Sequence, residues 1–291
     1  MHHFNFDFSA VQIIWTLTFA ALLVLLVVLL GRDRARRFPW FTASIVLTTL
    51  DMLGKRLLHG RMPQLTLAEI FITLADLGVL VGLLVVVEMA RSAFAGAKRS
   101  LWIVNILGML MVAGLVLAVW GPWPAWKTLT ANSQLAALGL MQFAAQKGEM
   151  LVSLLTVELG LLIVLFGRRF KAGWRSHTQQ IVIGLSTAAI AHLALQGTWQ
   201  LIVMKAVAHS QAEYDRILGM RDKLTNANGS VYLAVLLWWI VCLWTDEPGA
   251  IVEAPAEIAA VDEVVETVEV SADAPEEPAG DSLEEEQTED L

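Results

Sequence analysis

Charged residues are scarce in this chain. Asp, Glu, Lys and Arg make up 16% of its 291 residues, whereas hydrophobic residues make up 56%. Soluble domains carry about 25% charged residues. A spanning helix needs roughly 20 apolar residues to cross a hydrocarbon core about 30 Å thick, and several uncharged stretches approach that length. The composition therefore excludes an ordinary soluble domain and predicts a protein embedded in a lipid bilayer.

Cysteine and the familiar cofactor signals are also scarce. The single Cys242 lies in an apolar run, which excludes an intrachain disulfide and a thiolate metal cluster. The sequence has no Gly-rich nucleotide-binding loop, no lysine in its last apolar run that could hold retinal, and no second deep histidine beside His192 for haem or zinc. We therefore expect no cofactor and no nucleic-acid partner, and an enzyme is the least favoured reading.

Basic residues are missing from the C-terminal segment 246–291, which holds 17 Asp and Glu residues and no Lys or Arg. The preceding part has 20 basic and 11 acidic residues. This asymmetry predicts two regions, a membrane domain at 1–245 and an acidic tail at 246–291. High net charge and the absence of aromatic residues predict a disordered tail. The tail acts either as a solubilising spacer or as a docking segment for a basic cytoplasmic protein.

Apolar runs define the predicted fold class, an all-α polytopic bundle of about seven transmembrane helices. The runs are 10–30, 38–58, 67–90, 101–120, 150–166, 178–208 and 231–244. The first run is a retained helix and not a signal peptide, because its basic cluster follows it. The last run has only 14 apolar residues, about 21 Å of helix, and is the shortest. Residues 124–149 predict an interfacial amphipathic helix capped by Asn132 or Ser133. A polar extension of the sixth helix is predicted to end at 226–229.

Basic loop residues predict the orientation, because short cytoplasmic loops are enriched in Lys and Arg. The first, third and fifth loops fall on one side of the bundle. Their basic residues are Arg32, Arg34, Arg36, Arg37, Arg91, Lys98, Arg99, Arg168, Arg169, Lys171 and Arg175. We therefore predict a multi-pass protein of the cell inner (plasma) membrane, with its N-terminus outside and its tail inside.

Polar side chains recur at helical spacing inside several runs. The second run carries Ser44, Thr48, Asp51 and Lys55 at intervals of four, three and four residues, which places them on one face. The sixth run aligns three more polar residues at intervals of four, namely His192, Gln196 and Gln200. Ionisable groups in a span cost about 2.5–3.5 kcal/mol each, so each one requires a reason.

Depth estimates bring these groups to one layer. From the rise per residue, Asp51, Asp76, Glu158 and His192 lie about 9–13 Å below the outer surface. The agreement predicts a polar cavity in the outer half of the bundle, reached from the extracytoplasmic side. The predicted ligand-binding residues are Asp51, Lys55, Asp76, Glu158, His192 and Gln196.

Purely structural explanations stay open for these residues. Asp51 and Lys55 are four residues apart and can neutralise each other. His192 can be an interhelical hydrogen-bond partner, and Glu158 can be a neutral carboxylic acid. Glu149 is expected at the outer boundary in water, and Glu88 is expected to pair with Arg91 at the inner surface. Gly78 and Gly82 fit close helix packing.

Two short motifs carry a family resemblance. The segments Arg36-Arg37-Phe38-Pro39-Trp40-Phe41 and Val87-Glu88-Met89-Ala90-Arg91 resemble a pattern in small uncharacterised bacterial seven-helix proteins. Those proteins are similar to the N-out, seven-helix sensor region of some histidine kinases. The resemblance implies a sensory or signalling membrane module over 1–245. We expect no covalent signalling output from 246–291.

Two functional hypotheses follow. The first is a membrane sensor or interaction protein that binds a small ligand, ion or proton in the outer polar cavity and contacts a cytoplasmic partner through its tail. The alternative is a proton-coupled transporter or carrier that uses the intramembrane carboxylates. Against transport, the sequence has no inverted repeat and no pair of helices broken by glycine or proline.

Overall fold

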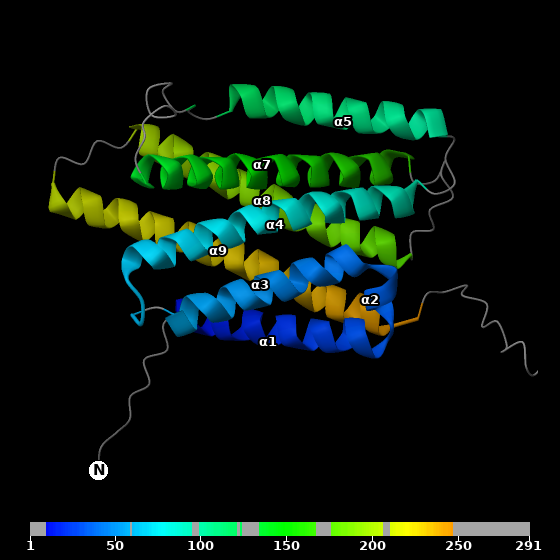
Figure 1. Cartoon of the computed structure of the whole chain (residues 1–291), viewed down its shortest axis with the longest axis horizontal. Helices are drawn as coiled ribbons and strands as arrows, with labels where there is room; N and C mark the ends of the chain where they lie inside the picture. Colours follow the sequence, from blue (N-terminus) through cyan, green and yellow to red (C-terminus); the bar gives the residue numbers. More distant parts are fainter. Residues whose placement is uncertain are drawn as a thin grey trace, which may run out of the picture. The chain divides into compact units, whose positions relative to one another are not determined.

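A computed structural model describes residues 10–58, 60–94, 99–120, 123, 134–166, 176–205 and 210–246, all within one compact unit of the chain. The described part is all-helical, as predicted (Figure 1). Its helices are α1 (Ala10–Gly31), α2 (Arg34–Arg37), α3 (Pro39–Leu58), α4 (Gln64–Ala93), α5 (Arg99–Val119), α7 (Gln134–Phe166), α8 (His177–Lys205) and α9 (Gln211–Trp244). The predicted disorder of the acidic tail and the predicted caps Asn132 and Ser133 fall outside the described residues.

Five helices are long and apolar enough to cross a membrane, as in a multi-pass membrane protein. They are Ala10–Gly31, Gln64–Ala93, Ala136–Leu165, His177–Ile202 and Glu213–Trp244. Two further long helices fall short of that standard for different reasons. α3 carries Asp51, Lys55 and Arg56 within its 20 residues. In α5 the side chains that the structure describes form a shorter apolar helix, Val104–Val119.

Six of the long helices pack in a closed order around one core. α1 packs against α3, α3 against α4, α4 against α7, α7 against α8, α8 against α9, and α9 returns to α1. α5 packs on α7 outside this ring and follows it along one side in Figure 1. Neighbouring helices in this order run in opposite directions, except that α4 runs parallel to α7 and α9 runs parallel to α1 (Figure 1). The C-terminal ends of α1, α4 and α7 therefore lie at the same end of the bundle as the C-terminal end of α9.

We call this end, which holds Arg32, Arg34, Arg36 and Arg37, the arginine end, and the half of the bundle next to it the arginine half. Many of the largest fully buried side chains of the described residues lie in this half. Phe41 and Trp239 meet edge to face with their ring centroids 5.1 Å apart. The indole of Trp239 covers Gly184 so closely that a Cβ there would collide with it. Other fully buried side chains nearby include Leu22, Leu25, Leu29, Met89, Leu159, Ile181, Leu236 and Leu243.

The start of α3 shows a role for Glu88 that differs from the prediction. Its carboxylate on α4 accepts hydrogen bonds from the backbone N–H groups of Trp40, at 3.1 Å, and Phe41, at 2.9 Å. These N–H groups belong to the first turn of α3, where no carbonyl of the same helix can accept them. The expected pair with Arg91 is therefore wrong, because Glu88 caps a neighbouring helix instead.

The helix α7 is continuous over 33 residues, about 50 Å, and joins the predicted interfacial helix to the predicted fifth span. The prediction of two separate elements here was wrong. Gly148, near the expected boundary, lies where α4 approaches α7 closely, and a Cβ there would lie 2.6 Å from Cγ1 of Val79. Gly82 on α4 is likewise covered by Val152 of α7, whereas the nearest atom to a Cβ at Gly78 belongs to Leu47 of α3.

The last helix, α9, contains the polar segment that was predicted to extend the sixth. It runs without interruption for 34 residues through 226–229, so the predicted stop there is wrong. Its start carries a capping signal, because the Ser210 hydroxyl accepts the N–H of Glu213 at 3.3 Å. A helix of about 51 Å exceeds the bilayer core, so the polar start of α9 projects beyond it.

Candidate functional site: two adjoining polar hollows

The other half of the bundle, which we call the hollow half, contains a cavity of about 380 Å³ between α3, α4 and α7. The polar stripe predicted on the second run lines it from α3, and α7 supplies a carboxylate and a hydroxyl from the opposite wall. The polar lining residues are Ser44, Thr48, Asp51, Lys55, Glu149 and Ser153. The rest of the wall is mostly apolar, with Phe71, Leu74 and Val79 among its side chains.

The acid and base of α3 form an ion pair at this cavity. Lys55 Nζ lies 2.6 Å from Asp51 Oδ2, one helical turn away. The Asp51 side chain is 28% exposed and the Lys55 side chain 58%, so the ammonium is the more accessible partner. It also lies 5.7 Å from the centre of the Phe71 ring on α4. The predicted pairing of Asp51 with Lys55 is confirmed.

A second cavity of about 270 Å³ lies between α7, α8 and α9. It shares Glu149, Val152 and Ser153 with the first, so the two cavities meet on α7. In this second cavity His192 Nε2 of α8 lies 3.5 Å from Glu149 Oε1. The Glu149 side chain is 62% exposed and the His192 side chain 30%. We refer to the two cavities together as the double hollow.

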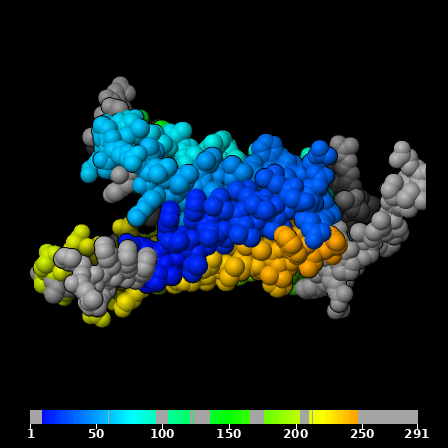
Figure 2. All heavy atoms as spheres, turned by 90° about the horizontal axis from the view of Figure 1, so that it is seen from below, coloured from blue at the N-terminus to red at the C-terminus, as the bar shows by residue number. Residues whose placement is uncertain are grey.

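The walls of the double hollow come together across the bundle. The Tyr232 hydroxyl of α9, which lines the second cavity, interacts with the side chain of Thr48 of α3, which lines the first. The helices separate beyond this point, and Figure 2 shows the turn from α3 to α4 standing apart from α9 at the end opposite the arginines. The double hollow is therefore built from five helices, α3, α4, α7, α8 and α9.

The structure brings together only some of the predicted site residues. Asp51 and Lys55 line the first cavity and His192 the second. Asp76 of α4 and Gln196 of α8 are half-buried but line neither of them. Gln200 of α8 accepts a hydrogen bond from the indole N–H of Trp120, which directly follows α5, at 2.9 Å. The polar stripe of α8 therefore extends from the double hollow towards the end of α5.

Glu158 lies away from this layer. It is eight residues before the end of α7 at Phe166, about 12 Å from the arginine end, whereas Glu149 is about 26 Å from it. The predicted common depth is therefore wrong for Glu158, because α7 begins earlier than the sequence indicated. Its Oε2 atom is buried and has no hydrogen-bond partner among the described residues.

Glu149 and Tyr232 are the wall residues that the sequence analysis missed. Glu149 was placed in water at the outer boundary because the helix was expected to start at residue 150. Tyr232 lies at the start of the last predicted apolar run, 231–244, which was expected to be short. The spacing Glu149-x-x-x-Ser153-x-x-Thr156 on a continuous helix would have marked a polar face, had the helix not been expected to begin at residue 150.

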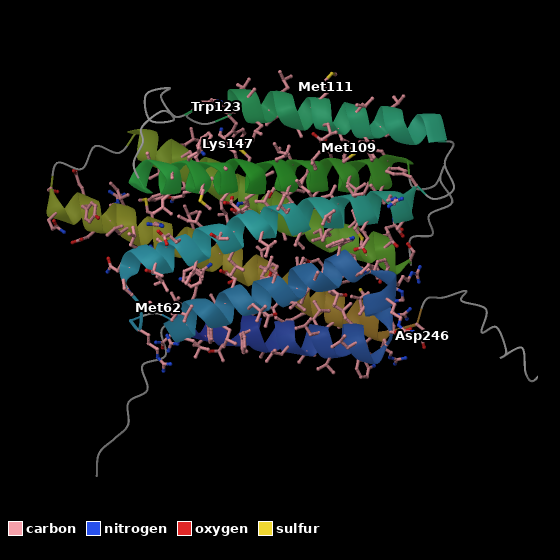
Figure 3. All side chains as sticks on the ribbon, viewed as in Figure 1. Met62, Met109, Met111, Trp123, Lys147 and Asp246 are labelled. Atoms are coloured by element: carbon pink, nitrogen blue, oxygen red, sulfur yellow. The ribbon has the colours of Figure 1, made fainter. Side chains whose placement is uncertain are left out.

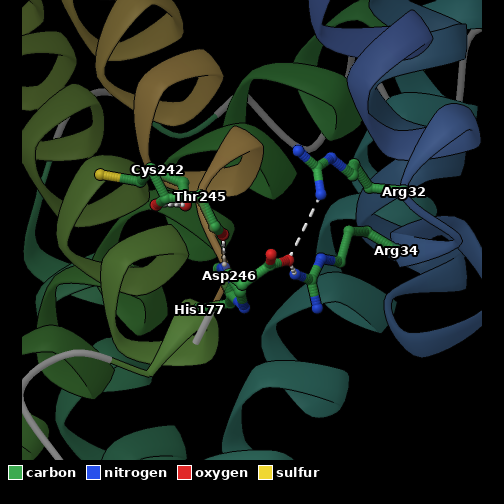
Figure 4. A network of polar contacts seen from close by, with 6 residues as sticks. All are labelled: Arg32, Arg34, His177, Cys242, Thr245 and Asp246. Carbon is green, nitrogen blue, oxygen red and sulfur yellow. Dashed lines mark hydrogen bonds and ion pairs between the residues drawn. The ribbon is translucent and has the colours of Figure 1, made fainter. Parts of the chain in front are cut away.

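Polar contacts at the arginine end hold α9 to its neighbours (Figure 4). Asp246 Oδ1 lies 3.4 Å from both Arg32 Nη1 and Arg34 Nη2. The carbonyl oxygen of Thr245 lies 3.0 Å from His177 Nε2 of α8. The arginine end is thus closed by contacts between α1, α2, α8 and the end of α9.

Aromatic and basic side chains meet at the other end of α5 and α7. The Lys147 ammonium lies 4.8 Å from the centre of the Trp123 ring and donates a hydrogen bond to the carbonyl of Trp120 (Figure 3). Indoles favour the membrane–water interface, where one edge is apolar and the other is wet. This cluster fits an interfacial anchor and lies outside the double hollow.

Among the described residues, no group of three or more His, Cys, Asp or Glu side chains is arranged to hold a metal ion. The side chains of the double hollow instead offer ionic and hydrogen-bonding groups to a small ligand. No protein-family model, curated protein or solved structure matches this chain.

Proposed function

We propose that this protein is a membrane sensor or interaction protein that binds a small ligand, ion or proton in the double hollow. The observation that carries the proposal is the meeting of two polar cavities at Glu149, Val152 and Ser153 within an apolar bundle. Ionisable groups at such depth are expensive and are usually functional. Concave sites with a few converging polar groups are also the usual form of ligand sites.

Seven spans and a defined orientation form part of the proposal. α3 and α5 would span together with the five more apolar helices, which puts the arginine end in the cytoplasm of a plasma membrane. The double hollow then faces the extracytoplasmic side, and the acidic tail is available to a basic cytoplasmic partner. The resemblance to seven-helix sensor regions agrees with this arrangement.

The packing of the two halves supports ligand binding more than transport. The arginine half is filled by Phe41, Trp239 and the side chains around them, so a solute in the double hollow meets a solid core below it. A carrier would have to move these buried aromatic rings in every cycle. Uptake into liposomes that depends on Asp51 or Glu149 would reverse this preference.

The proposal is tested by thermal unfolding of the purified protein in detergent against a panel of amines, acids, zwitterions, sugars and cations. We expect at least one class to raise the melting temperature, and the shift to disappear in Glu149→Gln and Asp51→Asn. Failure of the whole panel to raise the melting temperature, or a rise that is equal in the wild type and in both variants, would contradict a ligand site in the double hollow.

A further inference from the structure

The two acid–base contacts of the double hollow share one feature, a less exposed partner and a more exposed partner. In the first pair Asp51 is 28% exposed and Lys55 is 58% exposed. In the second pair His192 is 30% exposed and Glu149 is 62% exposed. The accessible groups are therefore one ammonium and one carboxylate, and both line the first cavity.

These two accessible groups come from opposite walls. Lys55 belongs to α3 and Glu149 to α7, and α4 lies between them with an apolar surface that includes Leu74 and Val79. Each of these groups contacts a less exposed partner, Asp51 for the ammonium and His192 for the carboxylate. The cavity thus presents separated charges of opposite sign on walls whose positions are fixed by packed helices.

We infer that the first cavity binds a small zwitterion that carries a primary ammonium and a carboxylate, as a free amino acid does. The ligand carboxylate faces Lys55, and the ligand ammonium faces Glu149. This inference rests on the proposed function and specifies the ligand class of the same site.

The arrangement selects against simpler ions. A lone cation is attracted by Glu149 and Asp51 but repelled by Lys55, whereas a lone anion is attracted by Lys55 but repelled by the two carboxylates. Only a ligand with both charges satisfies both walls, which is discrimination by repulsion as well as attraction. The cavity volume of about 380 Å³ lies within the range of small-molecule sites.

The test measures binding by isothermal calorimetry and thermal shift with a series of soluble probes. Glycine, β-alanine, 4-aminobutyrate and 6-aminohexanoate vary the distance between the charges, while butylamine, butyrate and butyramide each lack one charge or both. We expect one or two neighbouring members of the zwitterion series to bind at least tenfold more tightly than every single-charge probe. The charge separation of the zwitterion that binds most tightly then reports the distance between the charged groups of Lys55 and Glu149.

The zwitterionic headgroup of phosphatidylethanolamine offers the same chemistry, so the series is repeated in three settings. These are detergent without added lipid, nanodiscs of phosphatidylcholine, and nanodiscs containing phosphatidylethanolamine. Binding of the soluble zwitterions in all three supports a free solute. Stabilisation by phosphatidylethanolamine alone, with no soluble zwitterion bound, overturns the inference.

Charge-neutral variants test the two walls separately. Lys55→Gln and Glu149→Gln should each weaken zwitterion binding about ten- to a hundredfold, because each removes one charged hydrogen-bonding partner. Lys55→Arg and Glu149→Asp, which keep the charges, should retain part of the affinity and show that the fold is intact. Arg56→Gln and Asp222→Asn, which remove neighbouring exposed charges outside the double hollow, are the matched controls.

The outcomes separate this inference from the proposed function. If a neutral compound or a single-charge ion binds best and is lost in Glu149→Gln, the hollow is a ligand site but the zwitterion is wrong. Equal effects of Arg56→Gln and Lys55→Gln also overturn the inference. If nothing in the panel binds, both the inference and the proposed function fail.

Discussion

The arginine half and the hollow half of the bundle are built from the same long helices, yet they use their side chains differently. In the arginine half, Phe41, Trp239 and Leu159 fill the centre, and Glu88 satisfies the exposed N–H groups of a neighbouring helix. In the hollow half, the helices carry ionic pairs and hydroxyl groups around open space. Packing density therefore separates a supporting half from a half that can hold a ligand.

The largest expected contrast comes from the same truncation in each half. Leu159→Ala removes a side chain that is 1% exposed in the arginine half and should cost about 2–5 kcal/mol. Leu74→Ala at the cavity wall should cost less than half as much, because no new enclosed void forms. Reversible unfolding in mixed micelles measures both, and equal losses would contradict the difference in packing.

Glycines of α7 offer a second comparison within a single helix. Gly160→Ala places a methyl group onto Ser186 of α8 and should destabilise by about 1–3 kcal/mol. A Cβ at Gly139 meets nothing within 4 Å, so Gly139→Ala should stabilise by up to about 1 kcal/mol through helix propensity. Effects of the same sign at both positions would mean that α7 and α8 are not in close contact.

The smallest expected effect concerns the contacts that close the arginine end. Asp246 is 76% exposed, and its carboxylate lies 3.4 Å from each arginine. Asp246→Asn should therefore change stability by no more than about 1 kcal/mol, and added salt should reduce the effect further. A larger, salt-independent loss would show that this end depends on the ion pairs and not on its packed core.

Much of the fold could be predicted from the sequence because lipid imposes long apolar helices. The seven predicted runs correspond to seven long helices of the described part, and the polar face of α3 lines the first cavity as its spacing indicated. The errors came from small residues. A helix boundary was expected between residues 149 and 150 and another at 226–229, but α7 and α9 continue through them. Close packing of α4 on Gly148 and a start signal upstream at Ser210 accompany this continuity.

The candidate site was only partly predictable for a related reason. Lys55 could be paired with Asp51 from their spacing alone, since both lie on one helix. The contacts of Glu149 with His192, and of Thr48 with Tyr232, join helices far apart in the sequence. Which of these residues meet depends on the order in which the helices pack. The spacing of polar residues along a single helix does not specify that order.

The central claim, a hollow half above a solid half, is tested most directly by the accessibility of two adjacent threonines of α3. Thr48 lines the first cavity, whereas Thr49 is 7% exposed and faces the packed helices. In a Cys242→Ala background, Thr48→Cys and Thr49→Cys are treated with a membrane-impermeant thiol reagent on intact cells lacking the outer membrane. We predict modification of Cys at position 48 at least about tenfold faster than at position 49, slowed further by a bound ligand. Equal rates at the two positions, or modification of position 48 only from the cytoplasmic side of inverted vesicles, would contradict this account.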